Sequence, residues 1–500
     1  MKKNFLIVLL AFIASLSFAQ TWQNPMNVSG QPDMGIGDPY IFKFRGTYYM
    51  YSSSRDVEIR CWKSKDLISW SEAIVCSTDP IAKNAYAPEV VYWNGIFYMY
   101  TSPQGNGHYV LTSNSPIGPF VSASGNLQKK IDGSVFIDDD AKWYFYHANS
   151  SGIQGCTMSN PTSFGTSVNL NAQMNGQWTE APCLIKRNGI YYLLYTGNHV
   201  WSNGYRVDYA INATQNPISM YTPQMDQNPV LINTEGSFVG LGHGTAFIGP
   251  DLDTYYFTYH NLVRIGGGVA PARKFNYDRM AWNGNKLLIL GPTNWAQQPP
   301  ALANADFFER ADIGVDWSMP NGGNWSIKNK DLLSQDKMEG EYKAIFTPYS
   351  ESDYTAEFTI KEVATNGNDA KFGVVFSYKD EQNYGVALLN VSSNQLEINF
   401  QVNNVWGTVQ CYELPVGFNY RVWHSIRIEK NMQNYKFFID GLHKATLTSN
   451  LDGGQIGYMT RNCNGNFSYI AISDKVNGSG IFDVYKPIPG DIQAIHYNTG

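Results

Sequence analysis

The segment that decides the fold is residues 38–51, which read DPYIFKFRGTYYMY. An acidic residue and a proline precede an apolar strand, Arg45-Gly46 supply a tight turn, and a strand rich in aromatic residues follows. Two such runs joined by a glycine-containing turn are typical of an antiparallel β-hairpin. The segment therefore predicts two neighbouring strands of one small sheet.

The same unit recurs roughly every 50 residues, which is the signature of a repeat architecture. Its further copies occupy 87–98, 132–146, 180–192 and 243–257, without helical periodicity between them. A small sheet buries its faces only against neighbouring sheets, so five copies predict a five-bladed β-propeller. Because equivalent positions of the blades lie at equal radius, we expect Asp38, Asp132, Glu180 and His243 to converge at one end of the central channel.

A second domain is expected after residues 291–304, where GPT and PPA interrupt the repeat and indicate a short linker. Apolar and polar residues then alternate in several runs up to about residue 474, and an Asp440-Gly441 turn favours a hairpin. These runs predict an antiparallel β-sandwich, and residues 423–430 resemble the concanavalin A-like jelly rolls attached to many polysaccharide-degrading enzymes. The whole chain is thus predicted to be all-β, with a propeller over 20–296 and a jelly-roll sandwich over 304–476.

The sandwich is expected to be an accessory domain that the short linker holds against the propeller. Its acidic residues Glu357, Glu397 and Glu429 alternate with apolar residues, which predicts that they lie on a solvated outer face and form no catalytic pair.

Both chain ends carry recognisable patterns. Lys2-Lys3, an apolar run over 5–13 and Ser17-Phe18-Ala19 predict a secretory signal peptide over residues 1–19, and hence a secreted, periplasmic or extracellular protein. Residues 488–497 resemble the opening strand of a family 6 carbohydrate-binding module. We interpret 477–500 as a linker and the start of a truncated module, unless that resemblance is accidental.

Composition narrows the classes of partner. A net charge of −6 gives no electrostatic reason to expect nucleic acid or an anionic membrane as a partner. A content of 14% aromatic and 16% charged residues suits sheets that face sugars. No apolar stretch after the signal is long enough to span a bilayer, and we expect a monomer. Six cysteines allow the pairs Cys61–Cys76, Cys156–Cys183 and Cys411–Cys463, or else buried free thiols.

The propeller segment closely resembles glycoside hydrolase family 43 from about residue 23 to 291. The resemblance is carried by five short motifs in the order of the blades: 37–40 (GDPY), 86–90 (YAPEV), 131–134 (IDGS), 179–182 (TEAP) and 242–244 (GHG). Each motif alone is weak, whereas five in this order are specific.

The resemblance implies roles for individual residues. Asp38 would be the general base, Glu180 the general acid, and Asp132 an auxiliary carboxylate that keeps the acid protonated and orients it. His243 would help to hold a Ca²⁺ ion in the channel through water, and Arg273 would contact the sugar. Aromatic faces at Tyr86, Trp178 and Trp201 lie beside the motifs or in loops at the same end, where they could stack on sugar rings.

Simpler explanations exist for single residues. Asp38 before Pro39 and Asp132 before Gly133 are common turn pairs, and His243 could be a core histidine. Turn chemistry alone does not explain three acids at matching strand starts. Crowded carboxylates also repel one another, so such a cluster is costly unless it has a function. The run 138–140 is interpreted as a solvated hairpin turn.

Hydrolysis with inversion needs an ionised and a protonated carboxylate about 6.5 to 9.5 Å apart, which two blades facing across a channel can supply. The primary hypothesis is therefore a secreted inverting glycoside hydrolase of pentose-containing plant polysaccharides, as an α-L-arabinofuranosidase or β-xylosidase. The alternatives are a retaining fructosidase-like enzyme and a non-catalytic carbohydrate-binding propeller. The sugar, its linkage and exo or endo action depend on loops and stay open.

Overall fold

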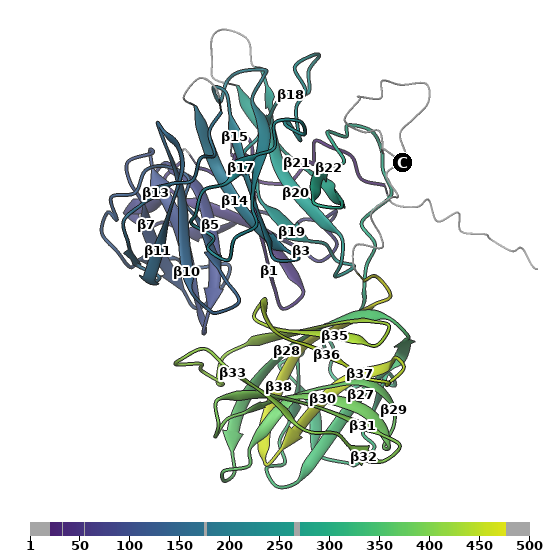
Figure 1. Cartoon of the computed structure of the whole chain (residues 1–500). Coiled ribbons are helices and arrows are strands. Elements are labelled where there is room, and N and C mark those ends of the chain that lie inside the picture. Colours follow the sequence, from purple (N-terminus) through teal and green to yellow (C-terminus); the bar gives the residue numbers. More distant parts are fainter. Residues whose placement is uncertain (1–20, 33, 55, 175–177, 265–270, 477–500) are drawn as a thin grey trace, which may run out of the picture.

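The computed structural model describes residues 21–476 except 33, 55, 175–177 and 265–270. The predicted signal peptide and the resemblance to a carbohydrate-binding module fall outside these residues. The described chain is built almost entirely of strands in two bodies, a propeller above and a sandwich below in Figure 1. None of its described helices is long and apolar enough to cross a membrane.

The propeller has five antiparallel sheets, as the repeat predicts, and each is a blade. Blade 1 holds β1 (Tyr40–Phe44), β2 (Thr47–Tyr51), β3 (Ile59–Ser64) and β4 (Ile74–Ser77), with a short 3-10 helix at Pro80–Ala82 after it; blade 2 holds β5 (Ala85–Trp93), β6 (Ile96–Pro103), β7 (Tyr109–Ser113) and β8 (Val121–Ser122). Blade 3 holds β9 (Ser134–Ile137), β10 (Trp143–Asn149), β11 (Gly152–Asn160), β12 (Ser163–Phe164) and β13 (Val168–Asn169); blade 4 holds β14 (Thr179–Arg187), β15 (Ile190–Gly197), β16 (Arg206–Asn212) and β17 (Thr222–Pro223). Blade 5 holds β18 (Val239–Gly242), β19 (Ala246–Ile248), β20 (Tyr255–Val263), β21 (Ala272–Asn283) and β22 (Lys286–Ile289).

The N-terminal segment ties the two ends of the propeller together. Met26 pairs with Phe275 of blade 5, and Trp22 pairs with Gln297 beyond it. Trp22 also stacks on Tyr277, with ring centroids 4.3 Å apart. The linker after β22 is therefore held against the propeller instead of leaving it directly.

A left-handed backbone residue recurs in every blade where the innermost strand meets the channel. These residues are Asp38, Ala87, Asp132, Ala181 and His243, with φ between 43° and 59°. Such a conformation costs a non-glycine residue about 1–3 kcal/mol, and it persists only where the surroundings impose it. The repeat predicts Glu180 at the position equivalent to Asp38 and Asp132. In the structure Ala181 occupies that position, and Glu180 lies one residue before it.

The sandwich packs two sheets face to face over one apolar core. One sheet holds β23 (Asn304–Asp306), β25 (Trp325–Lys328), β26 (Leu332–Gln335), β28 (Tyr354–Thr365), β34 (His424–Asn431), β35 (Asn434–Ile439), β36 (Leu442–Thr448) and β38 (Cys463–Ser473). The other holds β24 (Trp317–Ser318), β27 (Glu341–Glu351), β29 (Lys371–Asp380), β30 (Asn383–Asn390), β31 (Gln395–Val402), β32 (Val405–Trp406), β33 (Gln410–Glu413) and β37 (Gly454–Arg461).

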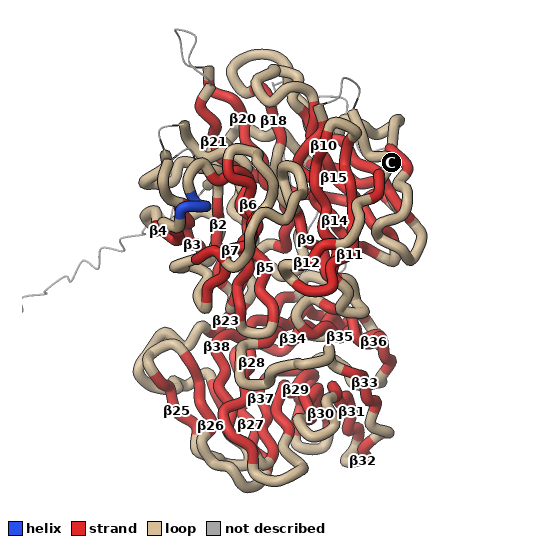
Figure 2. Tube along the Cα trace, turned by 90° about the vertical axis from the view of Figure 1, so that its left-hand side faces the viewer, coloured by secondary structure: helices blue, strands red, loops and turns tan. Residues whose placement is uncertain are grey.

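The sandwich docks on the propeller end opposite to the strand starts that carry the acids (Figures 1 and 2). Hairpin turns of the blades make the contacts: Arg45 Nε donates to Ser468 Oγ at 2.8 Å, and Asn94 Nδ2 donates to the Gly417 carbonyl at 2.9 Å. Leu252 is buried together with Tyr469 of β38. The contacts join both bodies without approaching the acids.

This docking corrects two expectations about acidic residues. Asp138 is buried, receives a hydrogen bond from Tyr191 Oη at 2.5 Å and pairs with Lys186, while Asp139 accepts the His443 N–H of β36 at 2.9 Å. The run 138–140 is thus a solvated turn only at Asp140, because Tyr191 and Lys186 of blade 4 enclose Asp138 and the sandwich contacts Asp139.

The outer face of the first sandwich sheet is also not fully solvated. Glu357 on that face pairs with Lys43 of β1 at 2.9 Å, and Glu429 pairs with Arg427. Glu397, in the other sheet, pairs with Lys371. The short linker folds one sheet face onto the propeller, which alternation of residue types could not reveal.

All six cysteines are free thiols, so none of the three disulfides considered is formed. Cys156 and Cys183 lie in different core clusters, while Cys463 is buried and Cys411 is exposed. Cys61 and Cys76 are in adjacent strands, yet Cys76 Sγ donates to the Ile59 carbonyl.

Candidate active site

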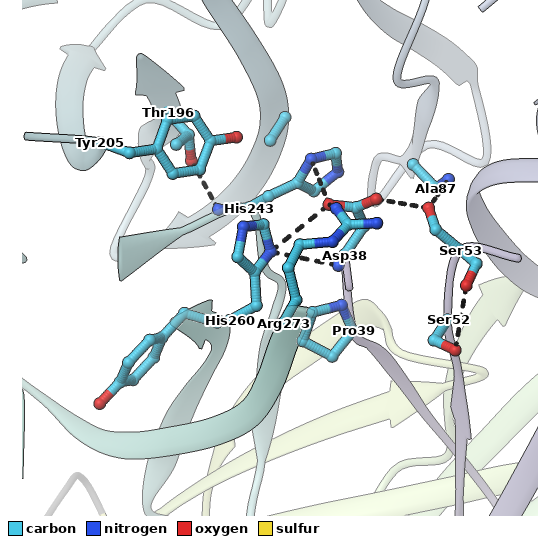
Figure 3. A network of polar contacts seen from close by, with 12 residues as sticks. Asp38, Pro39, Ser52, Ser53, Ala87, Thr196, Tyr205, His243, His260 and Arg273 are labelled. Carbon is cyan, nitrogen blue, oxygen red and sulfur yellow. Dashed lines mark hydrogen bonds and ion pairs between the residues drawn. The ribbon is translucent and has the colours of Figure 1, made fainter. Parts of the chain in front are cut away.

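Asp38 lines the cavity in the propeller channel, and basic and hydroxyl groups surround its carboxylate (Figure 3). Arg273 Nη1 is 2.6 Å from Oδ1, His243 Nδ1 is 3.1 Å from it, and the Ser53 hydroxyl donates to Oδ2. Gly37 makes this possible, because a Cβ there would lie 1.9 Å from Arg273 Cζ. Burial alone would raise the pKa of Asp38, but the charge of Arg273 and the hydrogen bond from Ser53 hold it well below its usual value. Asp38 is therefore ionised at neutral pH.

Glu180 has the opposite environment. It begins β14, is 8% exposed, and accepts a hydrogen bond from the Tyr205 hydroxyl on Oε1. Burial raises the pKa of Glu180 to about 7, with the Asp38 charge adding to the rise, while hydrogen bonds from Tyr205 and Trp178 oppose it. Glu180 can therefore hold a proton near neutral pH.

Asp132 completes the carboxylate trio. It is 4% exposed, and its Oδ2 lies 3.3 Å from the Ala181 N–H, next to Glu180. Burial and the charges of Glu180 and Asp38 raise the pKa of Asp132 well above its usual value. Asp132 and Glu180 thus compete for protons as a coupled pair.

Asp132, Glu180 and His243 each offer a ligand atom within 4.8 Å of the others. A cation bound directly there would force Glu180 to ionise and would remove its proton. A directly bound cation and a protonated Glu180 therefore exclude each other in this cluster.

Below these acids the channel contains a cavity with room for about two water molecules. It is lined by Tyr40, Glu89, Thr245 and the strained residues of the five blades. Ser134 Oγ and the Val135 N–H donate to Glu89, and burial raises its pKa to about 8. Glu89 belongs to the second motif, where the sequence marked no role for it.

The part of the chain that forms the propeller matches the model of a known family. The model of glycosyl hydrolases family 43 matches residues 34–287, which is just over half of the chain. The chain belongs to this family. It is therefore a glycoside hydrolase, an enzyme that cleaves O-glycosidic bonds.

Individual relatives are distant from this family 43 enzyme. A β-D-galactofuranosidase of Aspergillus niger is 25% identical over 277 residues, which are 49% of this chain and 79% of that protein. A xylosidase/arabinosidase of Butyrivibrio fibrisolvens is 30% identical over 133 residues, covering 23% of this chain and 26% of that protein. Among solved structures, the GH43 protein BlXynB of Bacillus licheniformis is 18% identical and covers 91% of this chain and 100% of its own, with a TM-score of 0.48.

Of the substrate-binding candidates, Arg273 contacts Asp38 directly, whereas the three aromatic residues lie outside the cavity lining. Trp178 is 40% exposed and packs on His199, with ring centroids 4.5 Å apart. His199 Nδ1 in turn accepts the Trp201 N–H, so both tryptophans share one rim beside Glu180. Tyr86 precedes the strained residue Ala87, which is the position that Glu180 occupies in blade 4.

Three site residues carried no signal in the sequence. His260 is fully buried in β20, and its Nδ1 lies 3.4 Å from Asp38 Oδ1. Tyr205 precedes β16, and Ser53 follows β2. All three reach the carboxylates from strands or loops that are not innermost, so no inner-strand motif contains them.

Proposed function

We propose that the protein is a secreted, inverting glycoside hydrolase that releases pentose units from plant polysaccharides or oligosaccharides, as an α-L-arabinofuranosidase or β-xylosidase. The observation that carries the proposal is the unlike environment of two buried carboxylates in one channel: Arg273 pairs with Asp38 at 2.6 Å, whereas the Tyr205 hydroxyl donates to Glu180. The names of curated relatives, which include xylosidase, arabinanase and arabinofuranohydrolase, support pentose-containing substrates.

In this mechanism Asp38 accepts a proton from water as the water attacks the anomeric carbon. Glu180 gives its proton to the leaving glycosidic oxygen, so the bond from carbon to that oxygen breaks while the bond to water forms. Arg273 and His243 keep the Asp38 carboxylate ionised and oriented until then. Burial and the charge of Glu180 raise the pKa of Asp132, so the two neighbouring carboxyls share protons, and an ionised Asp132 in turn favours the protonated form of Glu180.

Calcium remains a proposal for the channel near His243. Hard cations take oxygen ligands, and Glu89 is the one carboxylate in the cavity lining outside the proposed catalytic trio. Such an ion would be held mostly through water, and when bound it would add positive charge below the acids. No reaction step depends on it.

Chelation tests this ion. EDTA is expected to lower the Tm or activity reversibly, with recovery on adding Ca²⁺ but not Na⁺. Unchanged Tm and unchanged kcat after exhaustive chelation would contradict the proposed calcium site.

The proposed activity is tested with a panel of p-nitrophenyl glycosides and plant oligosaccharides, while NMR follows the anomer released first. We expect hydrolysis of an α-L-arabinofuranoside or β-D-xyloside with the opposite anomer appearing first. Retention of configuration, or cleavage of fructosides instead, would overturn the proposed mechanism. A purified, folded protein that binds the sugars but hydrolyses none of them would contradict the proposed hydrolase activity.

A further inference from the structure

Two buried rings lie directly behind the base and the acid. Tyr205 and His260 are both fully buried, and their rings are nearly parallel at 18° with centroids 5.6 Å apart. The Tyr205 hydroxyl donates to Glu180 Oε1. On the other side, His260 Nδ1 faces Asp38 (Figure 3). The stacked pair thus connects the two carboxylates from the protein side of the channel.

His260 is held by Asp38 and by burial. The Asp38 N–H lies 3.3 Å from His260 Nδ1, while His260 Nε2 is buried and has no hydrogen-bond partner among the described residues. Burial, with the Arg273 charge, keeps the pKa of His260 well below its usual value, which agrees with a neutral ring. His260 is therefore a fixed, uncharged surface for the Tyr205 ring.

The contact with Tyr205 also distinguishes the two oxygens of Glu180. Because Oε1 accepts the tyrosine hydroxyl, the acidic proton of Glu180 is placed on Oε2. When that proton leaves, the hydrogen bond from Tyr205 becomes a charge-assisted one and stabilises the new carboxylate. This contact is stronger after proton transfer than before it, which is the condition for accelerating the step.

We propose that Tyr205 is a positioning residue of the general acid: it orients Glu180, selects the oxygen that carries the proton, and stabilises the carboxylate formed as the leaving group departs. His260 holds the tyrosine ring in place. This rests on the proposed function, since Glu180 acts as the acid there.

Other groups around Glu180 act in different ways. Asp38 raises its pKa and Arg273 lowers it through charge, Trp178 lowers it through a partly exposed indole, and Asp132 and His243 complete the cluster. Tyr205 differs from all of them, because it places a fully buried hydroxyl against Glu180. Removing that hydroxyl leaves the charges in place.

The test is Tyr205→Phe in the full chain, compared with Tyr195→Phe, a buried tyrosine of the same blade whose charged neighbours are Asp208 and Arg206. We expect Tyr205→Phe to lower kcat/KM about 10- to 100-fold on xylo- or arabino-oligosaccharides, whose leaving groups need a proton. On p-nitrophenyl glycosides, whose leaving group needs little acid, the loss should be less than about threefold. Tyr195→Phe should change neither.

A second measurement does not depend on turnover. The carboxyl stretch of Glu180, identified by its loss in Glu180→Gln, is followed by infrared spectroscopy against pH. Its midpoint should move upward in Tyr205→Phe, because the lost hydrogen bond favoured the ionised form, and stay in place in Tyr195→Phe. Equal losses on both substrate types, or an unmoved midpoint, would overturn the proposal, whereas a wild-type protein without hydrolase activity would overturn the proposed function instead.

Discussion

At the residue scale, the active site depends on giving two chemically similar carboxylates opposite protonation states. Both Asp38 and Glu180 are 8% exposed, so burial alone would favour the neutral form of each. Arg273 reverses this preference at Asp38 through an ion pair of 2.6 Å, while Glu180 retains the raised pKa. The difference comes from neighbours and not from depth.

The first prediction concerns these two residues. Asp38→Asn and Glu180→Gln should each lower kcat on oligosaccharides by about 10²- to 10⁴-fold, the usual contribution of general acid or base catalysis. Circular dichroism should show an unchanged fold, because both replacements keep side-chain volume. A near-wild-type rate in either folded variant would show that the replaced residue is not the proposed general base or general acid.

The second prediction is the pH dependence of kcat/KM. The proposed mechanism requires ionised Asp38 and protonated Glu180, so the rate should be lost as pH rises through the pKa of Glu180 at about 7. Since the pKa of Asp38 is depressed, the acidic limb should lie far below it. A profile that stays flat up to pH 9 would contradict Glu180 as the acid.

The third prediction concerns Asp132→Asn. This change removes a carboxylate whose negative charge, when ionised, opposes ionisation of Glu180. The alkaline limb should move to lower pH, and the rate at the optimum should fall less than in Glu180→Gln. An unchanged limb would show that Asp132 does not act through the pKa of Glu180.

At the element scale, each innermost strand begins with a strained residue followed by proline or glycine. Where glycine follows, the reason is close approach of two chain segments: a Cβ on Gly244 would lie 1.6 Å from the Thr258 carbonyl oxygen. The glycine lets the inner strand of blade 5 meet β20 and places His243 beside Asp38.

The fourth prediction follows from that contact. Gly244→Ala should destabilise the protein by about 1–3 kcal/mol or more, the usual cost of overpacking, and should also lower activity by displacing His243. Gly125→Ala, where a Cβ meets nothing within 4 Å, is the matched control. Urea unfolding of both variants measures the difference, and equal stability would contradict the close approach.

At the scale of the whole molecule, the sandwich closes the propeller end remote from the acids (Figure 1). Lys43, Arg45 and Leu252 at that end contact one sandwich sheet. The domains should therefore depend on each other for stability more than for catalysis on small substrates.

The fifth prediction separates these effects with two turn glycines of positive φ. Gly46→Ala adds a Cβ 2.3 Å from the Tyr469 ring, whereas Gly284→Ala adds one in open space, so both carry backbone strain but only Gly46→Ala crowds the domain contact. We expect Gly46→Ala to lower the Tm further, with kcat on p-nitrophenyl glycosides unchanged. Equal Tm values would show that the contact contributes nothing to stability.

The sequence by itself determined the blade count and the order of the motifs, because these depend on local alternation, turn chemistry and repetition along the chain. It also indicated the acids Asp38, Asp132 and Glu180, since each lies within a blade's own inner-strand motif. It placed Glu180 one residue out of register, because a left-handed residue and a β-bulge leave no distinct mark in residue type.

Only the tertiary structure decided which groups surround those acids. Ser53, Tyr205 and His260 reach them from other parts of the blades, and the sandwich contacts the remote hairpin of blade 3, where the His443 N–H donates to Asp139 from 304 residues away. Such contacts join residues far apart in sequence and set the dielectric and charge around each carboxylate. Protonation state is a property of that surrounding, so it could not be derived from the motifs alone.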